Sequence, residues 1–143
     1  MADAATIRPA RSDEVEQVLA LWREAEATPS ATDNREEVLK LLAEPAAVLL
    51  VAEADGRLVG TVIGGWDGWR GNIYRLAVHP AYRRRGIARA LVGEAERRLH
   101  RMGARRISAL VESDHPWATE FWDSLGASGY WHDERMRRYV KTL

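Results

Sequence analysis

Apolar residues along the chain change their spacing several times, which predicts alternating strands and helices. Residues 6–9 predict a short strand that stops at a proline. A helix follows, with Ser12 or Asp13 as its expected N-cap and with apolar residues recurring every three or four positions. The expected buried face of this helix contains Val15, Val18, Leu19 and Trp22.

The next apolar positions predict a second helix and then three strands. Asp33 is the expected N-cap of this helix, and Pro45 ends it. The expected strands are residues 47–52, 58–63 and 73–78. A tight turn at residues 54–57 joins the first two strands, and a glycine-rich connection at residues 64–71 joins the last two.

A long amphipathic helix is predicted after the arginines of residues 83–85, with Gly103 as its C-cap. Its apolar stripe contains Ile87, Leu91, Ala95 and Leu99. The remaining expected elements are a strand at 107–111, a short helix at 116–125, and strands at 130–131 and 136–140. A three-strand meander followed by alternating elements indicates an α/β fold with a mixed sheet, in one domain over residues 1–143.

Composition narrows the classes of function. Lys and Arg total 21, and Asp and Glu total 21, so the net charge is zero and no overall field would attract nucleic acid. The absence of cysteine excludes disulfides, thiolate metal sites and a cysteine nucleophile, and the four histidines have no metal-binding spacing. No apolar run has the length of a signal peptide or of a membrane span, so we expect a cytoplasmic protein with no membrane partner.

The positive charge is concentrated at one helix start. Residues 83–106 contain nine arginines against Glu94 and Glu96, although a helix N-terminus disfavours cations. Backbone N–H groups there bind anions, Gly86 lets a ligand approach the backbone, and flanking arginines pair with phosphate oxygens. The pattern Arg-x-x-Gly-x-Ala therefore predicts a diphosphate site; the alternative is a solvated charge run. It is neither a Walker A loop nor a dinucleotide-binding fingerprint.

Residues 73–92, IYRLAVHPAYRRRGIARALV, resemble the core motif of the GNAT superfamily of N-acetyltransferases. That motif is a strand ending in L-x-V, a proline, the loop R/Q-x-x-G-x-G/A and a helix. The opening IRPARSDEVEQVLAL and the later FWDSLGA resemble other family elements, and the glycine-rich residues 64–71 look like a bacterial subgroup called YpeA-like. The resemblance implies a mixed sheet of about six to seven strands with a splayed parallel pair, flanked by about four helices.

The resemblance also implies an acetyl-CoA site between strands 73–78 and 107–111. The pantetheine arm would pair with the backbone of Leu76, Ala77 and Val78, and the pyrophosphate would lie on N–H groups near residues 84–89. Arg83 to Arg85 would reach the 3′-phosphate of the nucleotide. The full expected cofactor-binding set is Leu76, Ala77, Val78, Arg83, Arg84, Arg85, Gly86, Ile87, Ala88, Arg89 and His115, with no metal.

The implied reaction is direct attack of a primary amine of a small molecule, peptide or protein on the thioester carbon. The backbone N–H of Leu76 or Val78 would stabilise the developing oxyanion. The proton-transfer positions depart from the family, because His115 replaces an Asn and Trp122 replaces a Tyr whose proton an indole cannot supply. On strand alternation, Glu112 is the expected base instead, beside the same-side position Leu110.

Further candidates for proton transfer are Tyr74, Asp67, Tyr130 and Tyr139. Each site residue also has a structural interpretation: Glu112 pairs with an arginine, His115 caps a helix, and His79 shapes a turn. Trp66 and Trp69 either line the acceptor pocket with Trp117 and Trp122 or pack at a hairpin tip.

A non-catalytic acyl-CoA-binding or regulatory module is the alternative function, since the family Tyr is missing at Trp122. A nucleic-acid binder is the third class, and the zero net charge opposes it. We expect a bacterial enzyme that works as a monomer or homodimer with an amine acceptor.

Overall fold

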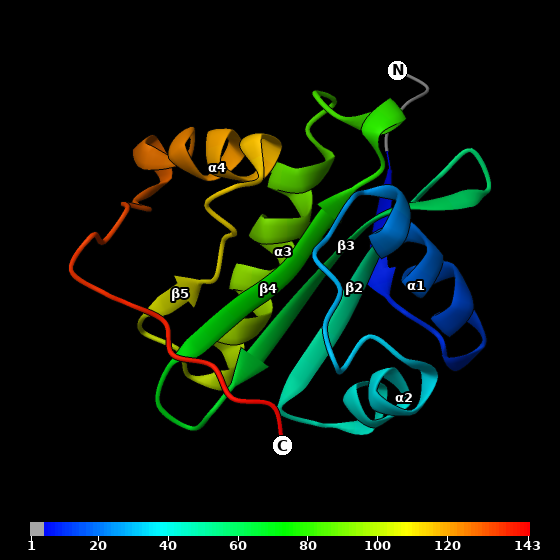
Figure 1. Cartoon of the computed structure of the whole chain (residues 1–143), viewed down its shortest axis with the longest axis horizontal. Helices are drawn as coiled ribbons and strands as arrows, with labels where there is room; N and C mark the ends of the chain where they lie inside the picture. The colour runs from blue at the N-terminus through cyan, green and yellow to red at the C-terminus, as the bar shows by residue number, and fades with distance from the viewer. Residues whose placement is uncertain (1–4) are drawn as a thin grey trace. The chain divides into compact units, whose positions relative to one another are not determined.

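The computed structural model describes residues 5–143 (Figure 1). Its strands are β1 (Thr6–Pro9), β2 (Ala47–Ala54), β3 (Arg57–Trp66), β4 (Gly71–Val78) and β5 (Ile107–Ala109). Its α-helices are α1 (Val15–Glu24), α2 (Arg35–Ala43), α3 (Ile87–Met102) and α4 (Pro116–Asp123). Three 3₁₀ turns, η1 (Ser12–Glu14), η2 (Pro80–Tyr82) and η3 (Gly126–Ser128), complete the set in the described residues. The chain divides into two compact units, Met1–Ala109 (described from Ala5) and Leu110–Leu143.

The first unit is built on one mixed sheet. Its strand order is β1-β2-β3-β4-β5, antiparallel except for the parallel pair β4 and β5. Helices α1 and α2 cover one face and α3 covers the other (Figure 1). The predicted α/β class, the mixed sheet and the four helices are therefore confirmed.

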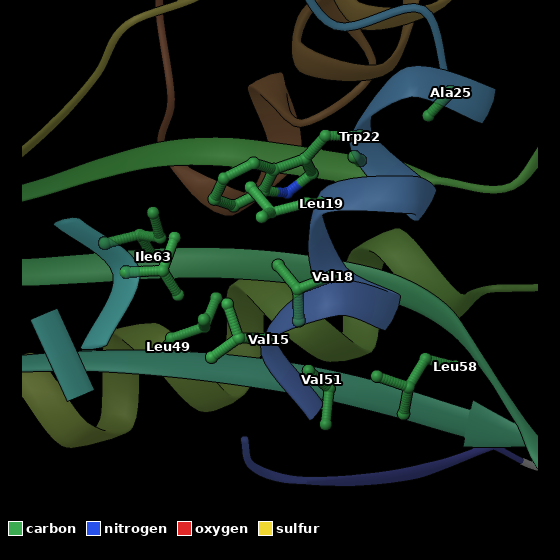
Figure 2. Close-up of a cluster of buried hydrophobic side chains, with 11 residues drawn as sticks. Val15, Val18, Leu19, Trp22, Ala25, Leu49, Val51, Leu58 and Ile63 are labelled. Atoms are coloured by element: carbon green, nitrogen blue, oxygen red, sulfur yellow. The ribbon is translucent and has the colours of Figure 1, made fainter. Parts of the chain in front are cut away.

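The face under α1 carries an apolar core. Figure 2 shows the side chains of α1 directed at apolar side chains of β2 and β3. The four predicted α1 residues, Val15, Val18, Leu19 and Trp22, are each at most 7% exposed. Burying a side chain of this size contributes about 1.5–3 kcal/mol, so the helical spacing accounts for the docking of α1.

The face under α3 depends on close approach of helix and sheet. A Cβ on Gly60 would lie 3.0 Å from Cδ1 of Leu91, and one on Gly71 would lie 3.1 Å from Cδ1 of Leu99. The predicted apolar stripe of α3 is fully buried here. The glycines thus bring the helix that follows the arginines directly onto β3 and β4.

Several local boundaries differ from the predictions. Asn34, not Asp33, caps α2, because its side chain accepts from the Glu37 N–H at 2.9 Å. Ser12 and Asp13 lie inside η1 instead of capping α1, which begins at Val15. The glycine-rich connection shrinks to residues 67–70, because residues 64–66 pair with residues 71–73 as strands.

The expected sheet of six to seven strands is wrong, since the described residues form five. Residues 130–131 and 136–140 are not strands. Two backbone hydrogen bonds in this segment are local turn contacts: the Tyr130 N–H donates to the Leu125 carbonyl, and the Met136 N–H donates to the Asp133 carbonyl. The large apolar side chains of residues 131 and 136–140 are exposed, including Tyr139 at 87%, so no packing favours an extended pairing there.

Candidate active site

The parallel strands β4 and β5 stay together over only three residues. Gly71, Asn72 and Ile73 pair with residues 107–109, whereas β4 continues to Val78. The N–H of His79 donates to the Val59 carbonyl at 2.8 Å, on the β3 side. Alternation along the ladder then turns the N–H groups of Leu76 and Val78 toward the opposite edge. In the described part of the chain, that edge has no strand partner beyond Ile73.

A β-bulge lies where this edge opens. The register between β3 and β4 shifts between Thr61 and Ile63, and Arg75 has a left-handed backbone with φ of 55°. The buried hydroxyl of Thr61 donates to the Arg75 carbonyl at 2.9 Å and accepts from the Trp22 indole at 2.9 Å. The bulge is thus hydrogen-bonded from inside the core.

The segment after β4 is tied back to the protein by two side chains. Nδ1 of His79 accepts from the Ala81 N–H at 3.1 Å, so His79 shapes the turn as its structural interpretation expects. Arg83 Nε donates to the Val78 carbonyl at 3.0 Å, and its Nη2 donates to the Ala25 carbonyl at 3.4 Å. Burial lowers the pKa of the Arg83 guanidinium. Arg83 therefore links the end of β4 to the end of α1.

The start of α3 has an irregular backbone with open space beside it. Arg84 and Gly86 are both left-handed, with φ of 65° and 83°, and Gly86 is the N-cap of α3. The Ala90 N–H donates to the Gly86 carbonyl, so the N–H groups of residues 87–89 precede the intrahelical bonds. A Cβ placed on Gly86 would meet no atom within 4 Å. Residues 84–89 therefore offer the space and donors that an anionic group requires.

The arginine-rich loop also contacts the β2–β3 turn. The Tyr82 hydroxyl donates to Asp55 Oδ2 at 2.8 Å, and this bond raises the pKa of Tyr82. The Arg85 guanidinium lies 4.8 Å from the centre of the Tyr82 ring. The loop that leads into α3 is thus fixed by contacts on both sides.

Tyr74 stands on the sheet face that α1 covers. It is 39% exposed, and its hydroxyl lies 3.2 Å from the position of a Cβ on Gly65. Gly65 shares a face with Ile63 of the α1 core, because side chains alternate along a strand. Tyr74 therefore lies beside the bulge, one residue before Arg75.

Known proteins resemble the chain in both sequence and fold. The sequence profile of the Acetyltransferase (GNAT) family matches residues 15–127. Acetyltransferase plu1384 of Photorhabdus laumondii is 38% identical over 109 residues, which are 76% of each chain.

The chain belongs to the GNAT acetyltransferase family. It is an acyltransferase.

Solved structures of other acetyltransferases have the same fold. The paia N-acetyltransferase of Thermoplasma acidophilum, solved with coenzyme A, has a TM-score of 0.76 at 19% identity, over 85% of this chain and 87% of that one. The aminoglycoside 6′-N-acetyltransferase AAC(6')-IG of Acinetobacter haemolyticus has a TM-score of 0.78 at 22% identity, over 96% and 99%.

Glu112 and His115 of this acetyltransferase lie in the second unit. The argument that placed Glu112 by strand alternation fails, because β5 ends at Ala109. The carbonyl of Glu112 accepts from the His115 N–H at 3.2 Å. Nδ1 of His115 accepts from the Ala118 N–H at 3.4 Å, so the helix-capping interpretation of His115 is confirmed.

Aromatic side chains cluster within this unit. The Trp117 ring stacks on Phe121 at 5.9 Å, and Trp122 meets Tyr130 edge-on at 5.1 Å. Trp122 therefore has the phenol of Tyr130 beside it.

Trp66 and Trp69 of the acetyltransferase separate into two environments. A Cβ on Gly103 would lie 3.2 Å from the Trp66 ring, so Trp66 packs at the C-terminus of α3. Trp69 is 72% exposed, with the Arg70 guanidinium 4.1 Å from its ring centre. Asp67 accepts from the N–H groups of Trp69 and Arg70, and these bonds lower the pKa of its carboxyl. Packing and turn formation explain Trp66 and Asp67.

Arg75 is the residue that sequence reasoning missed. Its only sequence signal is a charged residue inside a mostly apolar strand. Among the described residues, no group of three or more His, Asp or Glu side chains is placed to hold a metal ion. No helix among these residues is both long and apolar enough to cross a bilayer.

Proposed function

We propose that this chain is an acetyl-CoA-dependent N-acetyltransferase that transfers the acetyl group directly to a primary amine. The open edge of β4 beyond Ile73, followed along the chain by the open space at Gly86, carries the proposal. An extended pantetheine arm fits such an edge, and a diphosphate fits N–H groups at a helix start. The family membership and the coenzyme A in one structural relative support this assignment.

The proposed cofactor contacts follow the chain from the strand to the helix. Backbone groups of residues 76–78 bind the pantetheine arm, with the N–H groups of Leu76 and Val78 on the open edge. Residues 84–89 bind the pyrophosphate, and side chains of residues 83–85 approach the 3′-phosphate. Arg83 contributes mainly by holding the loop, because its guanidinium already bonds two carbonyl oxygens. His115 is a further proposed contact of the cofactor.

In the proposed reaction a neutral amine attacks the thioester carbon. A C–N bond forms, the C–S bond breaks, and coenzyme A leaves as a thiolate that takes up a proton, while the amine nitrogen loses one. The N–H of Leu76 or Val78 donates to the oxyanion. Tyr74 and Glu112 are the proposed proton-transfer residues. Tyr130, edge-on to Trp122, offers a hydroxyl in place of the missing tyrosine.

The second candidate is a non-catalytic acyl-CoA-binding module. Trp122 favours it, because an indole N–H does not supply a proton at neutral pH. We also propose that residues 64–71 mark the chain as a member of the YpeA-like subgroup. This assignment does not distinguish the enzyme from the binding module.

Thermal unfolding with acetyl-CoA tests the cofactor site, with dephospho-CoA and NAD as comparisons. A ligand at about 100 times its Kd adds about 2.7 kcal/mol of stability. We expect a shift of several degrees with acetyl-CoA and none in Gly86→Glu, where a carboxylate enters the space proposed for the pyrophosphate. Gly68→Glu is the matched control, since Gly68 also has a positive φ and open space. No shift for the unaltered protein would contradict the proposal.

Free-thiol release with a panel of spermidine, kanamycin, butylamine and a lysine-containing peptide then separates the two candidates. Release above the rate of acetyl-CoA hydrolysis supports the enzyme. A thermal shift without amine-dependent release from any acceptor favours the binding module.

A further inference from the structure

The side chain of Arg75 joins three segments at the point where β4 leaves β5. Its Nη2 donates to both carboxylate oxygens of Asp33, at 2.6 and 2.8 Å, and to the Thr28 carbonyl at 3.0 Å. Its guanidinium lies 5.1 Å from the centre of the Trp22 ring. The side chains of Arg75 and Asp33 are only 16% and 18% exposed. One side chain therefore connects β4 to α1 and to the loop before α2.

The backbone of Arg75 is also held, through its own carbonyl. Thr61 donates to that carbonyl, and Trp22 donates to Thr61, so Trp22 supports both ends of the residue. Arginine rarely adopts a positive φ, and such a conformation persists only where its surroundings over-determine it. The salt bridge, the ring contact and the hydroxyl bond supply that determination here.

Two features near the reaction centre depend on this anchor. Leu76 follows Arg75 directly, so the direction of its N–H on the open edge is set by the bulge. The connection between α1 and α2, residues 25–34, is bonded to Arg75 at Thr28 and Asp33 and to Arg83 at Ala25. The loop and the open edge are therefore held to each other by two arginines of β4 and the segment that follows it.

We propose that Arg75 is a positioning residue for acetyl transfer. It aims the N–H of Leu76 at the thioester carbonyl and holds the residue 25–34 loop beside the bulge. Arg75 itself touches neither acetyl-CoA nor the reacting atoms. This inference rests on the proposed function, because it assigns a role within that reaction.

A positioning role predicts that a variant of Arg75 loses kcat but keeps its KM and Kd for acetyl-CoA. An oxyanion donor that is displaced by a fraction of its bond length stabilises the transition state less, but binds the remote parts of the cofactor unchanged. Arg75→Met keeps an unbranched apolar stem but removes every guanidinium contact. We expect its kcat to fall about tenfold to a hundredfold, a loss comparable to or smaller than that of a whole oxyanion donor. The KM and Kd for acetyl-CoA should stay within about threefold.

Arg8→Met is the matched control for lost stability. Arg8 is 19% exposed and also bonds carboxylates, but it lies on β1. Both variants should unfold at lower temperature, whereas only Arg75→Met should lose kcat at a temperature where both are folded. Asp33→Asn, which keeps an amide oxygen for Arg75, should lose less kcat than Arg75→Met. Arg75→Lys retains the positive charge but lacks the planar guanidinium group, so its kcat should lie between those of wild type and Arg75→Met.

The rates are measured by thiol release with the best acceptor of the amine panel, or by acetyl-CoA hydrolysis if no amine reacts. The ¹⁵N-amide shift of Leu76 gives a second readout. It should respond differently to acetyl-CoA and to coenzyme A in wild type and Arg8→Met, and that difference should shrink in Arg75→Met.

The inference is overturned if kcat of Arg75→Met stays within twofold of wild type, or if Arg8→Met loses as much kcat as Arg75→Met. If Arg75→Met does not fold, the same criterion applies to Asp33→Asn and Arg75→Lys. Failure of wild type to bind acetyl-CoA would overturn the proposed function together with this inference. Turnover by wild type with unimpaired variants would overturn the inference alone.

Discussion

Two arginines of the sheet form similar ion pairs but have different backbones. Arg8 on β1 donates two hydrogen bonds to the carboxylate of Glu14, from Nη1 at 2.9 Å and from Nη2 at 2.7 Å. Its Nη2 also donates to Glu53 at 2.9 Å. Arg75 on β4 contacts Asp33 at similar distances. Arg8 pairs in the regular register of β1 with β2, whereas Arg75 sits in a left-handed bulge.

The difference teaches that contacts alone do not define the role of a residue. At Arg8 the backbone would adopt its conformation without the side chain, so the ion pairs only join β1, β2 and η1. At Arg75 the contacts hold a conformation that costs about 1–3 kcal/mol in an isolated residue. The contacts of Arg8 contribute to stability, and the contacts of Arg75 direct the edge of β4 that we assign to the cofactor.

Glu14→Gln should give the largest effect on stability. The hydrogen bond from Arg8 lowers the pKa of Glu14 from 4.5 to about 2. That depression corresponds to about 3 kcal/mol of stability, present above pH 4.5 and lost as the pH falls toward 2. Urea unfolding at pH 7 should therefore show a loss of about 3 kcal/mol in the variant. The gap from wild type should narrow below pH 4.5.

Glu16→Gln provides the control for this experiment. Glu16 has a side chain that is 71% exposed and a single ion-pair contact with Arg35 at 3.5 Å. We expect a change of less than about 0.5 kcal/mol. Equal losses in the two variants would contradict the stabilising role of the Arg8 cluster.

Thr61→Val should have the next largest effect and tests the bulge. The valine keeps the shape of the side chain but leaves the Trp22 indole and the Arg75 carbonyl without the hydroxyl. We expect a loss of about 2 kcal/mol in urea unfolding, because buried polar groups lose their partner.

The exposed hydroxyl of Thr32 provides the comparison, and Thr32→Val should change stability by less than about 0.5 kcal/mol. A Thr61→Val protein as stable as wild type would mean that the hydroxyl does not support the bulge. In that case Thr61→Val should also keep the kcat of wild type and should not show the fall that we expect for Arg75→Met.

Replacing Arg8 and Arg75 in turn by glycine and by alanine should give the smallest differences in stability, but with opposite signs at the two positions. Either substitution removes all side-chain contacts, so the difference reports the backbone. At position 75, with φ of 55°, glycine should be more stable than alanine by about 1 kcal/mol. At position 8, in a regular strand, glycine should be less stable by about 0.5–1 kcal/mol. The same sign at both positions, measured by urea unfolding, would remove the contrast between the two clusters.

Sequence spacing predicted the parts of the fold that depend on local chemistry. The faces of α1 and α3, the three-strand meander and the glycine C-cap of α3 all follow from residues close together in the chain. The arginine–glycine motif indicated an anionic ligand for the same reason, because a helix start and its flanking residues form one local unit. The C-terminal strands were predicted from β-propensity alone, which says nothing about a pairing partner.

The sequence by itself determined most helices and strands before the C-terminal segment, the family and the place of the proposed cofactor loop. Only the tertiary structure decided that Asp33 turns from capping α2 to bonding Arg75, across 42 positions of the chain. It also decided where β4 leaves β5 and that Arg75 takes a left-handed conformation there. These features arise from long-range contacts of one charged side chain and one buried hydroxyl, which neither periodicity nor propensity encodes.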